Sequence, residues 1–376
     1  MELDEYRASL DDWLERNTHV LTPDHDGIGT LDDQMAQLSK VKRLAFEAGW
    51  MRWGWPERVG GLGGSILLRA YLGEALTSRD LVEPGIYSMT EVLAPTMIDY
   101  APLDLAASMV PKLLSGEETW CQGFSEPATG SNLAALSCRA TRDGDVWRIS
   151  GQKVWTSLAQ YADRCVLLTR TGSSESAHTG ITALFVDMGS PGITVRPIET
   201  MHGVPEFSEV FFDDVAVPLD RTLGEEGQGW SVAMDLLPFE RSTALWHRVA
   251  YLHRRLQSLL DVAPAHLLDS VALGEVTQLL YALRARSRAT QYRVAAGEKL
   301  GPETSIDKVL VASAEQAVFD LVGAGLGEEV IMGDDPSSDR WRREYLYSRA
   351  ATIYGGTAEI QRNIIARRLL DLGSDR

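Results

Sequence analysis

The segment VWRISGQKVWTS, Val146 to Ser157, interleaves β-branched and aromatic residues with polar ones. Four similar runs follow it, RCVLLTRT, ITALFVDM, ITVRPIE and EVFFDDVAVP, and glycine, proline and aspartate lie between them. Residues of the first kind favour strands, whereas the intervening residues favour turns. The middle of the chain is therefore predicted to form a small antiparallel β domain, a barrel or a sandwich.

Both flanks of this β region carry the apolar spacing of helices. At the N-terminus the apolar residues of MELDEYRASLDDWLERN recur every three or four positions. Towards the C-terminus, long periodic segments such as MDLLPFERSTALWHRVAYLHRRLQSLL and IDKVLVASAEQAVFDLVGAGL are typical of a bundle. We therefore expect a mostly α protein with three domains: a helical domain at 1–118, the β domain at 119–219 and a four-helix bundle at 220–376.

The composition narrows the classes of function. The chain has 376 residues and a net charge of −17, which argues against nucleic acid or an anionic membrane as the main partner. Three cysteines and seven histidines show no metal-ligand spacing, so we expect reduced thiols and no metal site. The acidic N-terminus is not that of a signal peptide, and no apolar run approaches membrane-spanning length. We expect a cytoplasmic protein without membrane insertion.

Five motifs follow one another along the chain. They are QGFSEPATGSNLA, GQKVWTS, FSEVFFDDVAVP, GEEGQGW and IYGGTAEIQRNIIARRLL. In this order and spacing they resemble the acyl-CoA dehydrogenase family, and the resemblance covers nearly the whole chain. It implies a flavoprotein that holds FAD and oxidises the Cα–Cβ bond of an acyl-CoA thioester. The family fold that it implies has the same helical, β and helical order.

The resemblance implies flavin contacts at particular residues. The matching positions are Gln122, Phe124, Ser125, Ser131, Trp155, Ser157, Thr357 and Glu359. Ser131 also matches a substrate contact, and Leu158 stands where many members have asparagine. Each hydroxyl has an ordinary alternative, since serine favours turns and Thr357 could simply cap a helix. A strand tryptophan such as Trp155 could equally belong to the core.

The resemblance also locates a catalytic base. Many family members carry a catalytic glutamate in the turn matching IYGGT, where this chain has Gly355. A branch resembling the isovaleryl-CoA and long-chain dehydrogenases places the base on another helix, in an L-x-x-E-R-like segment. Glu240 and Arg241 of LLPFER match that segment. By residue type alone, a solvated helix glutamate and a surface arginine would be the simpler interpretations.

Carried over, these matches imply a division of roles. Glu240 removes the substrate α-proton while the β-hydride passes to flavin N5. The backbone N–H of Gly355 polarises the thioester carbonyl, and such donors stabilise a developing enolate. Arg241 lies near the CoA phosphates.

The implied partners are an acyl-CoA substrate and an electron-transfer flavoprotein as acceptor. The chain is expected to form a homo-oligomer, dimer or tetramer, or a heterotetramer with a related subunit. Two family motifs that reach the neighbouring subunit's flavin are altered. No Arg-x-x-Phe-Gly turn follows the first long bundle helix, and Asp320, Gly323 and Ala324 stand at the Gln-x-x-Gly-Gly positions. Arg284, Arg286 and Arg288 of the nearby LRARSR could substitute for these contacts, but they have no assigned role.

Three functions remain open at this point. The first is FAD-dependent dehydrogenation of an acyl-CoA, with a branched or bulky acyl group because glycine at 355 widens the pocket and the chain resembles actinobacterial members. The second is a flavin oxidase or monooxygenase on the same fold. The third is a largely structural subunit of a heteromeric dehydrogenase, which would be purified without flavin colour.

Overall fold

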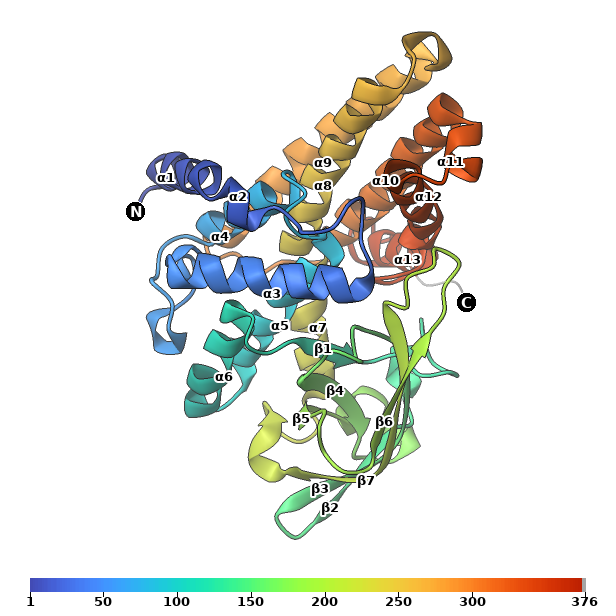
Figure 1. Cartoon of the computed structure of the whole chain (residues 1–376). Coiled ribbons are helices and arrows are strands. Elements are labelled where there is room, and N and C mark those ends of the chain that lie inside the picture. Colours follow the sequence, from blue (N-terminus) through green and yellow to red (C-terminus); the bar gives the residue numbers. More distant parts are fainter. Residues whose placement is uncertain (374–376) are drawn as a thin grey trace.

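The computed structural model describes residues 1–373, and it shows helical, β and helical blocks in the predicted order (Figure 1). The first block holds α1 (Leu3–Arg16), α2 (Thr18–Leu21), α3 (Leu31–Glu47), η1 (Trp50–Arg52), η2 (Glu57–Val59), α4 (Ile66–Thr77), α5 (Pro84–Tyr100) and α6 (Leu103–Ser115). The apolar spacing of the N-terminus is confirmed, because Tyr6, Leu10 and Leu14 are buried along one face of α1. Helix α3 begins at a capping box between Thr30 and Asp33, which satisfies backbone donors at its first turn.

The second block is a single sheet. Its strands are β1 (Trp120–Gly123), β2 (Arg139–Asp143), β3 (Val146–Ser157), β4 (Arg164–Arg170), β5 (Ile181–Asp187), β6 (Ile193–Ile198), β7 (Phe207–Pro218) and β8 (Thr222–Leu223). They are ordered β6-β7-β3-β2-β4-β5-β8, with β1 beside β4. The predicted antiparallel pairing holds for the long neighbours β3–β7 and β4–β5. It fails for β1, which runs parallel to β4 and brings the free thiols of Cys121 and Cys165 into register.

The third block is the helical bundle. It comprises α7 (Gly229–Glu240), α8 (Thr243–Val262), α9 (Ser270–Ala295), α10 (Thr304–Leu326), α11 (Glu328–Met332), α12 (Pro336–Ser348), η7 (Arg349–Thr352) and α13 (Ala358–Arg368), with the short turns η3 to η6 elsewhere. The bundle has its own apolar core, with Val249, Leu280 and Phe319 fully buried. In Figure 1 the ends of α8 and α9 project beyond the rest of the molecule.

One helix contradicts the prediction that no apolar run approaches membrane-spanning length. By length and composition alone, α10 could cross a membrane. In the structure it packs against α8, α9, α12 and α13, and half of its most apolar window is buried. Its buried charged residues are paired within the bundle, such as Asp307 with Arg286 and Glu315 with Arg248. These contacts are those of a bundle core helix.

The segment after Gly229 is not one continuous helix. Ser242 has φ −125° and ψ −82°, outside the helical region, so α7 ends at Glu240 and α8 begins at Thr243. Pro238 lies in the last turn of α7, where a proline removes a backbone donor. The break places Glu240 at the end of a helix, near the centre of the molecule.

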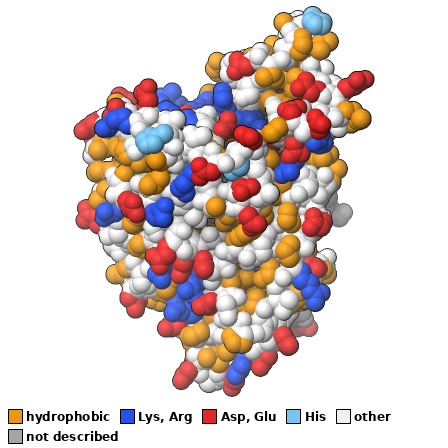
Figure 2. Space-filling model, in the orientation of Figure 1, with side chains coloured by type: hydrophobic (Ala, Val, Ile, Leu, Met, Phe, Trp, Pro, Cys, Tyr) orange, Lys and Arg blue, Asp and Glu red, His pale blue; other side chains and the backbone are white. Residues whose placement is uncertain are grey.

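Helix α5 joins the three blocks. It packs against α7 and α8 of the bundle and against strand β1 of the sheet. Its residues Ile86 and Val92 belong to a core that also contains Trp120 of β1 and Val232 of α7. Because α5 contacts both other blocks, the space beside it is walled by all three. On the surface, acidic and basic side chains are interspersed over the face shown in Figure 2.

Candidate functional site

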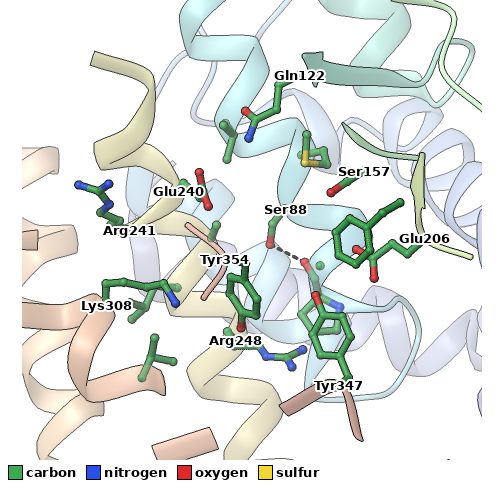
Figure 3. A pocket seen from close by; sticks show the side chains of 18 residues that line it. Ser88, Gln122, Ser157, Glu206, Glu240, Arg241, Arg248, Lys308, Tyr347 and Tyr354 are labelled. Carbon is green, nitrogen blue, oxygen red and sulfur yellow. Dashed lines mark hydrogen bonds between the residues drawn. The ribbon is translucent and has the colours of Figure 1, made fainter. Parts of the chain in front are cut away.

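A cavity of about 160 Å³ opens where the three blocks meet. Its walls come from α5, from the ends of β1, β3 and β7, from α7, α8, α10 and α12, and from the turn after η7 (Figure 3). Helix α5 contributes a mixed wall that includes Ser88 and Val92. Elements far apart in the chain therefore meet around one space.

Glu240 and Gly355 lie against one another at this cavity. A Cβ atom added to Gly355 would lie 2.7 Å from Oε1 of Glu240 and 3.1 Å from Cε of Lys308. Real Cβ contacts are longer than the first of these distances, so a side chain at 355 would require the Glu240 carboxylate to move from its present position. The carboxylate thus reaches, from α7, the space that a side chain at this turn would fill.

The turn itself has the backbone of a glycine pair. Gly355 has φ +61° and Gly356 has φ +90°, a region that other residues rarely adopt. Gln361 of α13 donates its side-chain amide to both carbonyls, at 3.1 and 3.3 Å, and so fixes the turn from behind. Within residues 1–373, the N–H of Gly355 has no hydrogen-bond acceptor. A backbone donor is therefore free beside the Glu240 carboxylate.

Two cations lie close to this pair. Lys308 donates from Nζ to the carbonyl of Ala351 at 2.6 Å and lies 4.2 Å from the ring centre of Tyr354. Burial lowers the pKa of Lys308 to about 8, against the opposing attraction of Glu240. Arg241 packs its Nη2 against Gly356, and burial lowers the pKa of its guanidinium. In Figure 3 the side chains of Glu240 and Arg241 point in different directions.

The sheet contributes two of the predicted flavin residues to the same cavity. Gln122 at β1 and Ser157 at the end of β3 both line it. The side-chain oxygen of Gln122 is buried and has no hydrogen-bond partner among the described residues. A buried amide oxygen without a partner is costly and is commonly satisfied by a ligand or water.

Trp155 has the exposure and backbone of a residue that is not part of the core. It has φ +58° and leaves 58% of its surface exposed, in an irregular part of the β3–β7 pairing. Its ring meets that of Phe207 edge-on at 6.0 Å. Leu158 has φ +60° and is buried, a conformation that asparagine adopts more easily. The exposed indole, the Ser157 hydroxyl and the unpartnered Gln122 amide together fit a flat polar aromatic group such as a flavin.

The other matched residues do not line the cavity. Phe124 is buried in the core, and the Ser125 carbonyl accepts a hydrogen bond from the N–H of Val154. Ser131 is exposed on the loop after β1. Thr357 caps α13 by accepting from the N–H of Ile360 at 3.3 Å, which is the ordinary alternative for this residue. Glu359 is exposed in the first turn of α13 and lies 4.0 Å from Arg362.

The structure also accounts for residues that had no assigned role. Arg284 pairs with Glu74 of α4, and Arg286 pairs with Asp307 of α10. Asp320 pairs with Arg349 at 2.9 Å. All three side chains therefore form ion pairs within the chain. Within the described residues, no group of three His, Cys, Asp or Glu side chains could hold a metal ion.

Sequence reasoning missed the polar end of the cavity. Glu206 precedes β7, Arg248 lies on α8, and Tyr347 and Tyr354 follow from α12 and the turn after η7. Arg248 donates from Nε to Glu315 at 2.9 Å and from Nη2 to the same carboxylate at 2.5 Å. None of these residues falls in the five motifs that carried the resemblance, apart from Tyr354. The one available sequence signal was that Arg248 and Glu315 interrupt the regular spacing of apolar residues in α8 and α10, which could have indicated a buried ion pair.

The chain was compared with known proteins. Models of the acyl-CoA dehydrogenase N-terminal, middle and C-terminal domains match residues 2–117, 121–215 and 227–370. A Mycobacterium tuberculosis protein named acyl-CoA dehydrogenase IpdE1 is 35% identical over 99% of this chain and 98% of its own length. The human mitochondrial short-chain specific acyl-CoA dehydrogenase is 29% identical over 84% of this chain and 78% of its own.

Solved structures agree. One described as the Tcur3481-Tcur3483 steroid ACAD is 25% identical, with a TM-score of 0.82 over 99% of this chain and 96% of that one. A chain of the ChsE4-ChsE5 complex from Mycobacterium tuberculosis is 26% identical, with a TM-score of 0.77 over 99% of this chain and 98% of that one. The protein therefore belongs to the acyl-CoA dehydrogenase family, whose members are oxidoreductases and generally flavoproteins.

Proposed function

We propose that this protein dehydrogenates an acyl-CoA thioester between Cα and Cβ with FAD as its cofactor, and that Glu240 is the base that removes the α-proton. The observation that carries the proposal is the 2.7 Å approach of the Glu240 carboxylate to the side-chain position of Gly355. In many family members a catalytic glutamate belongs to that turn. The carboxylate here reaches the same space from α7, as in the branch with an L-x-x-E-R-like helix.

The residues around Glu240 are suited to acidifying the α-proton. The free N–H of Gly355 can donate to the thioester carbonyl, and a donor aimed at a developing enolate oxygen lowers the barrier to proton removal. The cation of Lys308 lies near the same point and favours negative charge there. Glu240 then needs only to accept one proton within a site that the three blocks enclose.

FAD would be held where the sheet meets the bundle. Gln122 and Ser157 would bind its ring system, because they present an unpartnered amide and a hydroxyl to the cavity, and the exposed indole of Trp155 lies two residues before Ser157 on β3. When bound, FAD supplies the acceptor for the hydride that leaves Cβ. Phe124, Ser125, Ser131, Thr357 and Glu359 are further proposed contacts that rest on the family resemblance alone.

The proposed partners rest on the same family resemblance. Arg241 is proposed to lie near the CoA phosphates, Ser131 to contact the substrate, and an electron-transfer flavoprotein to reoxidise the flavin. The projecting ends of α8 and α9 leave Val262, Leu267 and Val271 largely exposed, which supports assembly into an oligomer. The ChsE4-ChsE5 complex, a structural relative, is described as an assembly of two different chains, and this supports a heterotetramer beside a homo-oligomer.

One observation favours the structural-subunit alternative. Arg284 and Arg286, two of the three arginines that could substitute for the altered motifs, pair within the chain, whereas Arg288 is exposed. A subunit that cannot complete its neighbour's site would still fold and assemble. Flavin absorbance of the chain purified alone separates this alternative from the main proposal, since the structural subunit would be colourless.

The decisive test is the Glu240→Gln variant. We expect it to retain flavin and to bind acyl-CoA, while its flavin is bleached by acyl-CoA at least about 1,000-fold more slowly, because an amide cannot accept the α-proton. The control is Glu226→Gln, the same change at an exposed glutamate before α7. Undiminished bleaching by Glu240→Gln would exclude Glu240 as the base.

A further inference from the structure

The far end of the cavity is polar, which a pocket for a plain alkyl chain does not require. Glu206, Arg248 and Tyr347 line it, and in Figure 3 they lie away from Glu240 and Gln122. A second cavity of about 60 Å³ adjoins the first and shares these three residues and Gly85 with it. Ligand pockets use a few placed polar groups to fix orientation and specificity.

Arg248 has donor capacity left over. Its Nε and Nη2 both donate to the buried carboxylate of Glu315, so its charge is balanced and its orientation is fixed. Tyr354 donates a further hydrogen bond to Glu315 at 3.1 Å. Among the described residues, Nη1 of Arg248 has no acceptor. A guanidinium carries five N–H donors, so Nη1 of Arg248 can still donate to an oxygen.

Glu206 and Tyr347 place two more oxygens at the same end. A Cβ atom added to Gly85 of α5 would lie 3.9 Å from the Tyr347 hydroxyl and 4.0 Å from Oε1 of Glu206. Both oxygens therefore flank the backbone of Gly85. Neither has a hydrogen-bond partner within residues 1–373. Burial raises the pKa of Glu206 to about 7, although the positive charge of Arg248 opposes this shift.

The charges around this end disfavour an anionic ligand. The arginines that line this end of the two cavities already have acidic partners, Arg248 in Glu315 and Arg343 in Asp339. Glu206 and Glu83 add two further carboxyl groups. A carboxylate placed here would meet an excess of acidic groups in a partly desolvated site. A neutral oxygen would instead accept from Arg248 or Tyr347, and a hydroxyl could also donate to Glu206.

The position of these groups sets the distance from the reacting carbons. Glu240 ends α7 and Arg248 lies in the second turn of α8, on the other side of the break at Ser242. Within α8 alone, the five residues from Thr243 to Arg248 correspond to about 7.5 Å at about 1.5 Å per residue. The recognised oxygen would therefore lie several carbon atoms beyond Cβ.

We propose that the acyl group carries a neutral oxygen function, a hydroxyl or a ketone, remote from the thioester, and that Arg248, Tyr347 and Glu206 bind it. This inference rests on the proposed function and narrows its substrate class. It differs from the expectation of a merely bulky acyl group, because it requires a particular kind of atom in addition to space.

The test compares four thioesters of equal chain length. Octanoyl-CoA, 8-hydroxyoctanoyl-CoA, 7-oxooctanoyl-CoA and octanedioyl-CoA are mixed with the flavin-loaded protein, and kcat/KM is measured from flavin reduction. We expect one of the two neutral oxygenated thioesters to exceed both octanoyl-CoA and the dicarboxylate by at least about tenfold, because a site built to hydrogen-bond an oxygen rejects analogues that lack it. Binding of the same four thioesters to Glu240→Gln is measured by calorimetry and should follow the same order.

Two variants identify the groups responsible. Tyr347→Phe should reduce the preference for the oxygenated thioester over octanoyl-CoA by about three- to tenfold, as expected for one lost hydrogen bond. Tyr345→Phe, the same change on α12 at a residue that lines neither cavity, should leave the preference unaltered. Gly85→Ala should also reduce the preference, since the new methyl fits between Glu206 and Tyr347 without a clash. Gly85 is the second residue of α5 and does not have a positive φ, so alanine is compatible with its backbone and this variant keeps its fold.

The outcomes separate the two proposals. Equal or better kcat/KM with octanoyl-CoA or octanedioyl-CoA, at unchanged flavin content, would overturn the substrate inference and leave the dehydrogenase function standing. Flavin reduction by none of the four, together with the expected binding order in Glu240→Gln, would reject the reaction and keep the recognition. Loss of both would overturn both.

Discussion

Two clusters of buried charge can be compared in this molecule. In the N-terminal block, Arg69 of α4 pairs with Glu91 of α5 at 3.3 Å, and Lys42 donates to Thr90 at 3.1 Å. Arg69 also lies 3.7 Å from the ring centre of Trp55. In the bundle, Arg248 pairs with Glu315 beside Glu206 and the cavity. Both clusters pair arginine with glutamate, yet only the second borders open space.

The pKa directions show that burial alone does not identify a site. Burial raises the pKa of Glu91 and lowers that of Lys42 to about 7. Burial likewise raises the pKa of Glu206, to about 7. Perturbed groups are expected at functional sites, but packed ion pairs produce the same shifts. What distinguishes the bundle cluster is the hydrogen-bonding capacity of Arg248, Glu206 and Tyr347 that is left facing a cavity.

The largest expected effect concerns the buried charges of the N-terminal block around Arg69 and Glu91, called the closed cluster because they border neither of the two cavities. Glu91→Gln should lower the free energy of unfolding by about 3 kcal/mol, because it leaves Arg69 buried without a counter-charge. The rate of flavin reduction per folded molecule should change less than about twofold. Urea denaturation followed by circular dichroism measures the first quantity, and flavin bleaching measures the second.

A double variant sharpens this test. Replacing both partners, Arg69→Met with Glu91→Leu, should recover most of the lost stability, since removing a whole buried pair is often nearly neutral. A Glu91→Gln protein that is fully stable but slow in flavin reduction would break the comparison, because the closed cluster would then act on the reaction.

The next effect concerns the turn beside Glu240. Gly355→Ala should slow flavin reduction by about 10- to 100-fold, because its Cβ would meet Oε1 of Glu240 at 2.7 Å and displace the carboxylate. Gly144→Ala is the matched control: Gly144 has φ +57°, against +61° for Gly355, and its Cβ would meet open space. Each variant should lose about 1 kcal/mol of stability from backbone strain. Equal activity of the two variants would show that the carboxylate does not need its present position.

The smallest effect is a pH dependence of stability. Glu206 has a folded-state pKa of about 7, above its ordinary value, so the folded protein keeps a proton that the unfolded chain has released. This contribution to stability is therefore lost as pH rises from about 5 towards 7, and it stays lost above. Glu206→Gln has no group that titrates here, so its free energy of unfolding should not fall with pH in this way. The free energy of unfolding of the variant minus that of the unaltered protein should therefore rise between pH 5 and pH 8 by on the order of 1 kcal/mol. A difference that stays flat or falls over this range would contradict the assignment.

Some of the fold and site could be read from sequence because the signals are local. The alternation in VWRISGQKVWTS and the helical spacing around Leu10 reflect which face of one element is buried. The glycine pair at Gly355 reflects a backbone conformation that other residues avoid. The candidate base Glu240 came from a motif of adjacent residues. The domain boundaries at 118/119 and 219/220 stay predictions.

Other features required the tertiary structure. The sequence determined the order of blocks and named Glu240 and Gly355 as candidates, but only folding brought them within contact, since 115 positions separate them. The polar end of the cavity was decided wholly by the fold. Glu206, Arg248 and Tyr347 come from a loop and two helices, and no local pattern joins them. A charged residue in a helix has the same sequence signature whether it faces water, a closed core or a cavity, because that difference depends on the elements packed against it.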